Sequence, residues 1–126
     1  MNPVHVVALL AVLEFFVFTA LVGQARVRYG VKAPAVSGHE QFERAYRVQM
    51  NTLEQLAIFL PALLIAGLYW PAAWVAGAGV VWLIGRLLYR HGYLRDPKAR
   101  MPGFALTLLP SLVLLVAALT GAITGV

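Results

Sequence analysis

Three polar side chains share one face of a predicted helix just before a long apolar segment. Arg47, Asn51 and Glu54 are spaced by four and three residues, and at about 100° per residue this spacing places them along one stripe. The segment 50–69 that they enter is apolar enough to span a bilayer. An arginine, an amide and a carboxylate together supply a cation, hydrogen-bond donors and an anion. Such a stripe suits a small zwitterionic or anionic ligand.

A second polar set lies at the end of the next apolar segment. Tyr89 and Tyr93 are four residues apart, so they share a helical face, and Arg86 precedes them by one turn. Arg95 and Arg100 follow in a loop. If the two apolar segments pack together, within one chain or between neighbouring chains, the two sets surround one cavity. That cavity would combine fixed cations, hydroxyl donors and at least one carboxylate.

The composition requires a bilayer as the solvent for these elements. Of the 126 residues, 61% are hydrophobic, against roughly 45–50% in soluble domains. Spanning helices need about 20 mostly apolar residues. Four segments qualify, at roughly 3–24, 50–69, 72–90 and 103–124. We therefore expect an all-α, integral membrane four-helix bundle that forms a single domain over residues 1–126.

The second helix can begin early, inside the polar loop 25–49. The later part of this loop reads "SGHEQFERAYRVQ", and we expect Ser37 or Gly38 to cap the helix. Two ion pairs at i,i+4 would support its first turns, namely Glu40 with Arg44 and Glu43 with Arg47.

The basic residues fall in two clusters that flank the predicted spans. The net charge is +5 and all ten Lys and Arg residues belong to one of two groups: Arg26, Arg28, Lys32, Arg44 and Arg47, or Arg86, Arg90, Arg95, Lys98 and Arg100. In a soluble protein this charge would suggest a nucleic acid, but at the ends of spans it does not, and we expect no nucleic-acid partner.

Four spans place both basic loops on one side of the membrane and both termini on the other. The positive-inside rule makes the loop side cytoplasmic. A cleaved signal peptide is the alternative interpretation of residues 1–24, because "GQA" resembles a small-residue cleavage site. The basic region that begins such peptides is missing here.

Each polar group also has a purely structural explanation. Arginines at the cytoplasmic ends of spans commonly anchor helices and face lipid phosphates. Glu54 can pair with Arg47 or Arg86 merely to fix helix packing. Glu14, near the middle of the first span, is a second membrane carboxylate, and no obvious cation lies at its depth. Glu14 can therefore belong to a functional site or can serve only helix packing, and the sequence favours neither interpretation.

Residue types restrict the chemistry further. The chain has no cysteine, so neither a disulfide nor a protein thiolate is available, and any thiol chemistry must use a borrowed thiol. His5, His39 and His91 are scattered without carboxylates at ligand spacing, so we expect no metal site.

The two polar sets also carry a resemblance to a known family. "FERAYRVQMNTLEQLAIFLPALLIAG" followed by "GRLLYRHGYLRDPKAR" resembles the membrane-associated proteins in eicosanoid and glutathione metabolism, the MAPEG family. The resemblance extends from Gln24 to Arg100, and the first and last spans agree only in hydrophobicity. Its specific part is E-R-x-x-R-x-Q-x-N-x-x-E, then R-x-x-Y-x-x-G-Y-x-R, then a further arginine.

The resemblance implies both an assembly and an activity. The family's fold is a four-helix bundle assembled as a homotrimer, with glutathione bound between neighbouring subunits near the cytoplasmic face. It implies a transferase that uses glutathione as co-substrate and takes a lipophilic electrophile or a hydroperoxide from the membrane lipid. It implies that Arg100 is catalytic, beside the thiol, and that seven residues hold glutathione: Arg26, Arg47, Gln49, Asn51, Glu54, Tyr89 and Tyr93.

The groups of glutathione fit these residue types. Arginines can bind its two carboxylates as charge-assisted pairs while Glu54 binds its ammonium group. A guanidinium near the sulfur lowers the pKa of the thiol, because it stabilises the thiolate. Thiolate attack on an activated carbon gives a conjugate, and attack on a hydroperoxide gives the alcohol and, with a second glutathione, the disulfide.

Two departures from leukotriene C4 synthase, a member of the family, narrow the activity. Gln55 stands where that enzyme has a tyrosine at the glutathione pocket, and Val27 stands where it has a second arginine, proposed to act on the lipid epoxide. The second departure favours a general transferase or peroxidase. Two alternatives stay open: a small proton-coupled multidrug exporter that uses Glu14, and a non-catalytic scaffold of the same family.

Overall fold

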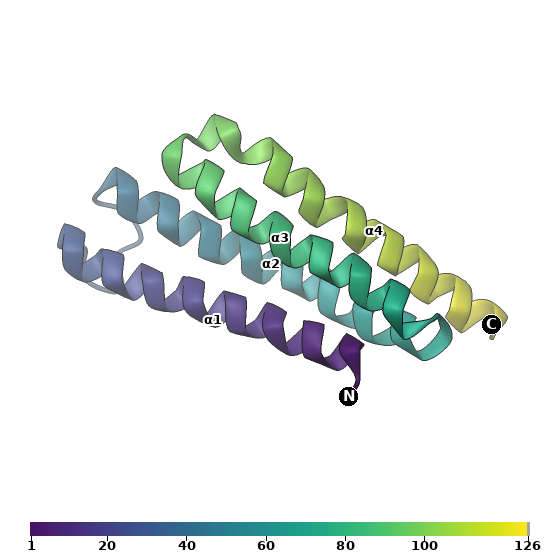
Figure 1. The fold of residues 1–126 in the computed structure, drawn as a ribbon. Helices are drawn as coiled ribbons and strands as arrows, with labels where there is room; N and C mark the ends of the chain where they lie inside the picture. The colour runs from purple at the N-terminus through teal and green to yellow at the C-terminus, as the bar shows by residue number, and fades with distance from the viewer. Residues whose placement is uncertain (126) are drawn as a thin grey trace.

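The computed structural model describes residues 1–125 as four long helices and one short 3-10 helix. The elements are α1 (Pro3–Tyr29), α2 (Glu40–Tyr69), α3 (Ala72–Arg95), η1 (Pro97–Arg100) and α4 (Met101–Thr124) (Figure 1). Residues 1–125 contain no strand, so the all-α prediction is confirmed. Val126, the last residue of the expected domain, lies outside the described residues.

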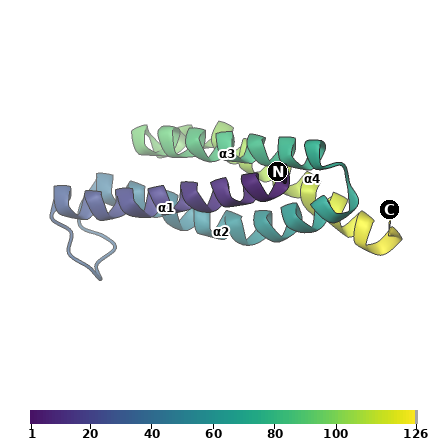
Figure 2. The same ribbon diagram turned by 60° about the horizontal axis from the view of Figure 1, so that its bottom comes forward.

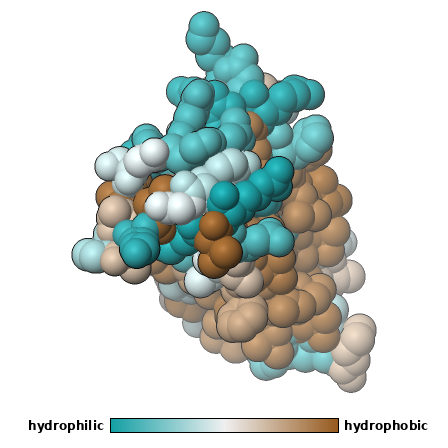
Figure 3. Space-filling view, turned by 90° about the vertical axis from the view of Figure 1, so that its left-hand side faces the viewer, coloured by the Kyte–Doolittle hydropathy of each residue, from teal (hydrophilic) through white to brown (hydrophobic). Residues whose placement is uncertain are grey.

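The four long helices run alternately up and down one elongated bundle. The α1–α2 loop and the α3–α4 connection lie at one end, and the α2–α3 connection and both termini lie toward the other (Figures 1 and 2). Both basic clusters therefore share one end, as the four-span pattern predicts. Seen from that end, hydrophilic residues cover the tip of the bundle and hydrophobic residues cover its flank (Figure 3).

Each long helix is long and apolar enough to cross a membrane. Large hydrophobic side chains are exposed on several of them, among them Phe16 on α1, Leu68 on α2 and Leu109 on α4. Apolar side chains that point outward are costly in water and favourable in lipid. The packing therefore agrees with the predicted integral membrane bundle.

The helices extend past the predicted spans at the polar end. α2 begins at Glu40, and its N-cap is His39, whose Nδ1 accepts a hydrogen bond from the Gln41 N–H at 3.1 Å. The expectation that Ser37 or Gly38 caps α2 is wrong. His39 has the extended backbone of an N-cap residue, whereas Gly38 has a φ of 139° and turns the chain just before it.

One of the two predicted ion pairs at the start of α2 is present. Arg44 pairs with Glu40, as predicted. Glu43 instead accepts a hydrogen bond from the Gly38 N–H at 3.1 Å, and within residues 1–125 it makes no ion pair with Arg47. Arg47 is thus left available to the cavity described below.

Two glycines bring α3 and α4 into direct backbone contact. A Cβ on Gly103 would overlap the backbone of Tyr89, and a Cβ on Gly85 would lie 2.8 Å from the carbonyl oxygen of Leu106. Small residues allow this approach between membrane helices. The first turn of α4 and the preceding η1 are consequently held against the polar end of α3.

Candidate functional site

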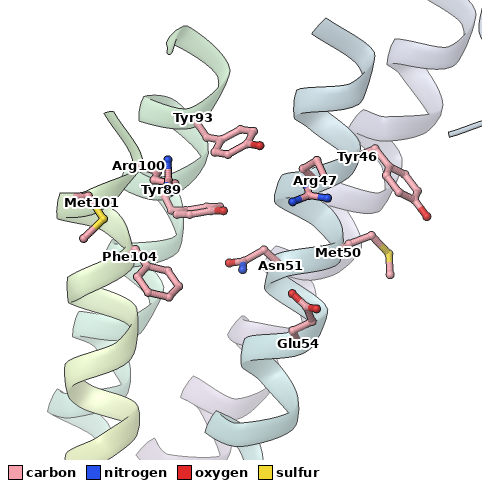
Figure 4. A pocket seen from close by; sticks show the side chains of 10 residues that line it. All are labelled: Tyr46, Arg47, Met50, Asn51, Glu54, Tyr89, Tyr93, Arg100, Met101 and Phe104. Atoms are coloured by element: carbon pink, nitrogen blue, oxygen red, sulfur yellow. The ribbon is translucent and has the colours of Figure 1, made fainter. Parts of the chain in front are cut away.

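A cavity of about 730 Å³ opens between α2, α3, η1 and α4 at the polar end of the bundle. Its lining residues are Tyr46, Arg47, Met50, Asn51, Glu54, Tyr89, Tyr93, Arg100, Met101 and Phe104 (Figure 4). Six of the eight residues predicted from the sequence line it: Arg47, Asn51, Glu54, Tyr89, Tyr93 and Arg100. We refer to this cavity as the polar pocket.

One wall of the polar pocket is the stripe predicted on α2. Arg47, Asn51 and Glu54 follow one another along the same side of the helix, and Asn51 points across toward α3 and α4 (Figure 4). Arg47 and Glu54 are exposed, whereas Asn51 is half-buried. Within residues 1–125 Glu54 forms no ion pair. The structural alternative in which Glu54 pairs with Arg47 or Arg86 is therefore not observed.

The opposite wall is formed by aromatic rings. Tyr89 and Tyr93 stack with ring centroids 5.6 Å apart and an interplanar angle of 26°. The centre of the Phe104 ring, on α4, lies 6.3 Å from the centre of the Tyr89 ring. Both tyrosines extend toward α2, so their hydroxyl groups face the α2 stripe (Figure 4). Stacking fixes the rings and leaves the hydroxyls available to a ligand.

Arg100 is positioned by the short helix η1. The side chain of Asp96 accepts a hydrogen bond from the Lys98 N–H at 3.1 Å and caps η1. At the other end of η1, Arg100 Nη1 donates to the carbonyl oxygen of Pro97 at 2.9 Å. The side chain is exposed at the pocket, so a second cation stands on the side opposite Arg47.

Two predicted residues do not line the polar pocket of this chain. Arg26 Nη1 donates to the carbonyl oxygen of Ala35 at 2.7 Å, and its guanidinium lies 4.8 Å from the centre of the Phe42 ring. Gln49 Nε2 donates to Thr19 Oγ1 at 3.1 Å. Both side chains contact residues of α1, α2 and the loop between them. Their role in binding glutathione stays a prediction.

Arg86, which the sequence pattern placed with the second polar set around the cavity, does not line the polar pocket. It is completely buried (0% exposed), and it donates hydrogen bonds to Asn51, Thr52 and Thr107. Glu14, the other carboxylate predicted within the spans, forms no ion pair within residues 1–125, and its Oε1 has no hydrogen-bond partner there. The available signal was that an arginine inside a span must find partners.

The residue types in the polar pocket define the ligand that it can hold. Two arginines on facing walls can bind anionic groups, Glu54 can bind an ammonium group, and tyrosine hydroxyls and an amide supply directional hydrogen bonds. The polar groups are bordered by three large apolar side chains, Met50, Met101 and Phe104. A small zwitterionic ligand can thus lie next to a lipophilic one.

The fold and the pocket define a class of protein, namely a membrane-type four-helix bundle with a charged ligand pocket at one end. Comparison of the sequence with protein families narrows this class. The model of the MAPEG family matches residues 4–120. The chain belongs to the MAPEG family, and the resemblance noted from the two polar sets is confirmed.

Individual relatives agree with this assignment. The chain is 50% identical over 110 residues to an uncharacterised protein of Synechocystis, covering 87% of this chain and 80% of that protein. It is 39% identical over 102 residues to microsomal glutathione S-transferase 2 of Homo sapiens, covering 81% and 69%. It is also 39% identical over 95 residues to leukotriene C4 synthase of Cavia porcellus, covering 75% and 63%.

Proposed function

We propose that this protein is a membrane-bound glutathione transferase that binds glutathione in the polar pocket. The observation that carries the proposal is the convergence of Arg47, Asn51, Glu54, Tyr89, Tyr93 and Arg100 on one cavity. Similarity to proteins named as a microsomal glutathione S-transferase and a leukotriene C4 synthase supports it.

Each group of glutathione has a matching group in the pocket. Arg47 can bind a carboxylate, Glu54 can bind the ammonium group, and the hydroxyls of Tyr89 and Tyr93 can bind the remaining polar atoms. Arg100 is the residue we assign to the thiol. Its guanidinium lowers the pKa of that thiol by stabilising the thiolate, which is the nucleophile.

A glutathione thiolate held next to the lipid phase can attack a lipophilic substrate. The sulfur forms a bond to an electrophilic carbon, and the leaving group departs with its electron pair. With a hydroperoxide, the sulfur instead attacks the terminal oxygen and the O–O bond breaks. The alkoxide that leaves takes up a proton and becomes the alcohol. A second glutathione then reacts with the sulfenic acid that remains and gives the disulfide and water. Holding both reactants in one cavity replaces a bimolecular encounter.

We further propose a homotrimer with sites shared between subunits and with the basic loops in the cytoplasm. Two observations favour shared sites. Glu54 is exposed on α2, a helix long and apolar enough to span a membrane, and a carboxylate in a span is unfavourable unless it is covered or paired. Arg26 and Gln49 lie outside the polar pocket of their own chain. If all eight predicted residues bind one glutathione, the Arg26 and Gln49 side chains must come from a neighbouring copy of the chain. The positive-inside rule supports the orientation.

Thiolate formation tests the proposal. Detergent-purified wild type, Arg100→Ala and Glu14→Gln would be titrated with glutathione and followed by ultraviolet difference absorbance of the thiolate. We expect a signal in wild type and Glu14→Gln that is lost in Arg100→Ala. No glutathione binding in any variant would refute the transferase and favour transport that depends on Glu14. Glutathione binding without turnover in the folded protein would favour a non-catalytic scaffold.

A further inference from the structure

A buried arginine joins three helices directly beneath the polar pocket. Arg86 of α3 donates through Nη2 to Thr52 Oγ1 at 2.8 Å and to Asn51 Oδ1 at 2.9 Å, both on α2. Its Nη1 donates to Thr107 Oγ1 of α4 at 3.4 Å. A fully buried cation in a membrane helix is unfavourable unless such acceptors surround it. These three acceptors therefore hold the guanidinium in one place.

The direction of every hydrogen bond in this cluster is fixed. The Thr52 hydroxyl donates its only hydrogen to the carbonyl oxygen of Val48 at 2.8 Å, and the Thr107 hydroxyl donates its hydrogen to the carbonyl oxygen of Gly103 at 2.9 Å. Each hydroxyl oxygen can then only accept. Since an arginine can only donate, the cluster has a single consistent arrangement.

This arrangement determines which end of Asn51 faces a ligand. Asn51 lines the polar pocket, and its Oδ1 is occupied by the Arg86 guanidinium. A flipped amide would place its NH₂ group against a cation that accepts no hydrogen bond. The NH₂ group is therefore the part of the amide that remains for the pocket. Asn51 is presented as a hydrogen-bond donor.

Arg86 also supports the aromatic wall. Its guanidinium carbon lies 4.4 Å from the centre of the Tyr89 ring, within the range of an attractive cation–π contact. Arg86 itself has no exposed surface, so it does not touch a ligand. Its influence on the pocket passes through Asn51 on one wall and Tyr89 on the other.

We propose that Arg86 is a positioning residue for glutathione recognition: it orients Asn51 so that its NH₂ group donates to a carbonyl or carboxylate oxygen of the bound peptide, and it fixes the ring of Tyr89. This inference rests on the proposed function, because it takes glutathione as the ligand. In this role Arg86 affects how tightly and selectively glutathione binds, whereas Arg100 is assigned to the formation of the thiolate.

The main variants are Arg86→Gln and Asn51→Asp, with Arg90→Gln as the matched control. Arg90 lies one turn further along α3 and is half-buried. Its guanidinium carbon lies 5.5 Å from the centre of the Phe18 ring, and the residue does not line the polar pocket. Glutathione affinity would be measured by calorimetry on detergent-purified protein, and helix content by circular dichroism would establish that each variant is folded.

We expect Arg86→Gln to weaken glutathione binding about tenfold, the effect of losing one well-oriented hydrogen bond. Asn51→Asp should weaken it at least as much, because a carboxylate keeps the Arg86 contact but presents an acceptor where the ligand needs a donor. Arg90→Gln should bind like wild type. At saturating glutathione the thiolate fraction of Arg86→Gln should equal that of wild type, since Arg100 sets it.

A double-mutant cycle separates positioning from general loss of structure. The effects of Arg86→Gln and Asn51→Ala on affinity should be strongly non-additive, whereas those of Arg86→Gln and Arg90→Gln should add. Wild-type affinity in folded Arg86→Gln would overturn the inference alone. If Arg86→Gln does not fold, wild-type affinity in Asn51→Asp would overturn it. No binding by wild type would instead refute the proposed function.

Discussion

The same pair of helices, α3 and α4, forms two very different cavities at its two ends. At one end, with α2 and η1, it encloses the polar pocket of about 730 Å³. At the other end it forms a groove of about 590 Å³ whose lining is almost entirely apolar, made by Trp70, Trp74, Val75, Ala78, Leu112, Val113, Leu114, Val116, Ala117 and Thr120. We call this second cavity the apolar groove.

The difference between the two cavities lies in their charged and polar groups. The two cavities are similar in size, so volume does not distinguish them. The polar pocket gains a third helix, whose stripe of Arg47, Asn51 and Glu54 faces the rings of α3, and it gains Arg100 from η1. Charged groups within a membrane protein are costly and mark function by default. The apolar groove lacks them and suits lipid.

The largest effect should come from removing Arg100, the cation that we assign to the thiol. Arg100→Ala should reduce turnover on the order of a hundredfold, because a single electrostatic stabiliser of a reacting group contributes that much. Activity would be measured with a lipophilic electrophile at saturating glutathione. Retention of full turnover would show that the polar pocket does not owe its reactivity to this charge.

Removing the carboxylate on α2 should have the next largest effect. Glu54→Gln should weaken glutathione binding about thirtyfold, because the ligand ammonium loses a charge-assisted hydrogen bond. A glutathione analogue without the amino group provides the control, since its affinity should hardly differ between wild type and Glu54→Gln. An equal loss of affinity for both peptides would contradict the assigned pairing.

A smaller effect is expected from a single hydroxyl on the aromatic wall. Tyr93→Phe keeps the stacked ring next to Tyr89 and removes one hydrogen-bonding group, so the affinity for glutathione should fall about fivefold. Calorimetry on wild type and Tyr93→Phe would measure it. Unchanged affinity would mean that the Tyr93 hydroxyl makes no contact with the ligand.

The smallest effect is expected at the apolar groove. Trp74 is 73% exposed, so Trp74→Ala should leave glutathione affinity and thiolate formation unchanged. Both would be measured beside Arg100→Ala in the same detergent. A loss of glutathione binding in Trp74→Ala would show that the two cavities are coupled and would remove the contrast between them.

Much of this arrangement could be predicted from local sequence patterns. Apolar length gave the four spans, and the spacing of Arg47, Asn51 and Glu54 gave one wall of the pocket, because helical geometry alone decides which side chains share a face. The two clusters of basic residues indicated which ends of the helices come together. The facing tyrosines followed in the same way from their spacing of four.

Features that depend on contacts between helices could not be predicted in this way. Thr52 and Thr107 are ordinary polar residues in the sequence, and only packing shows that both accept from Arg86. His39 replaced the expected cap because it has the extended backbone of an N-cap residue and its Nδ1 accepts from the Gln41 N–H, a role that the sequence pattern assigned to Ser37 or Gly38.

A structure of the protein determined with glutathione would test the proposed site most directly. We expect the peptide in the polar pocket, with its thiol next to Arg100, its ammonium group on Glu54 and one of its oxygens accepting from the NH₂ group of Asn51. Glutathione bound elsewhere on the bundle, or no bound glutathione at saturating concentration, would contradict the proposal.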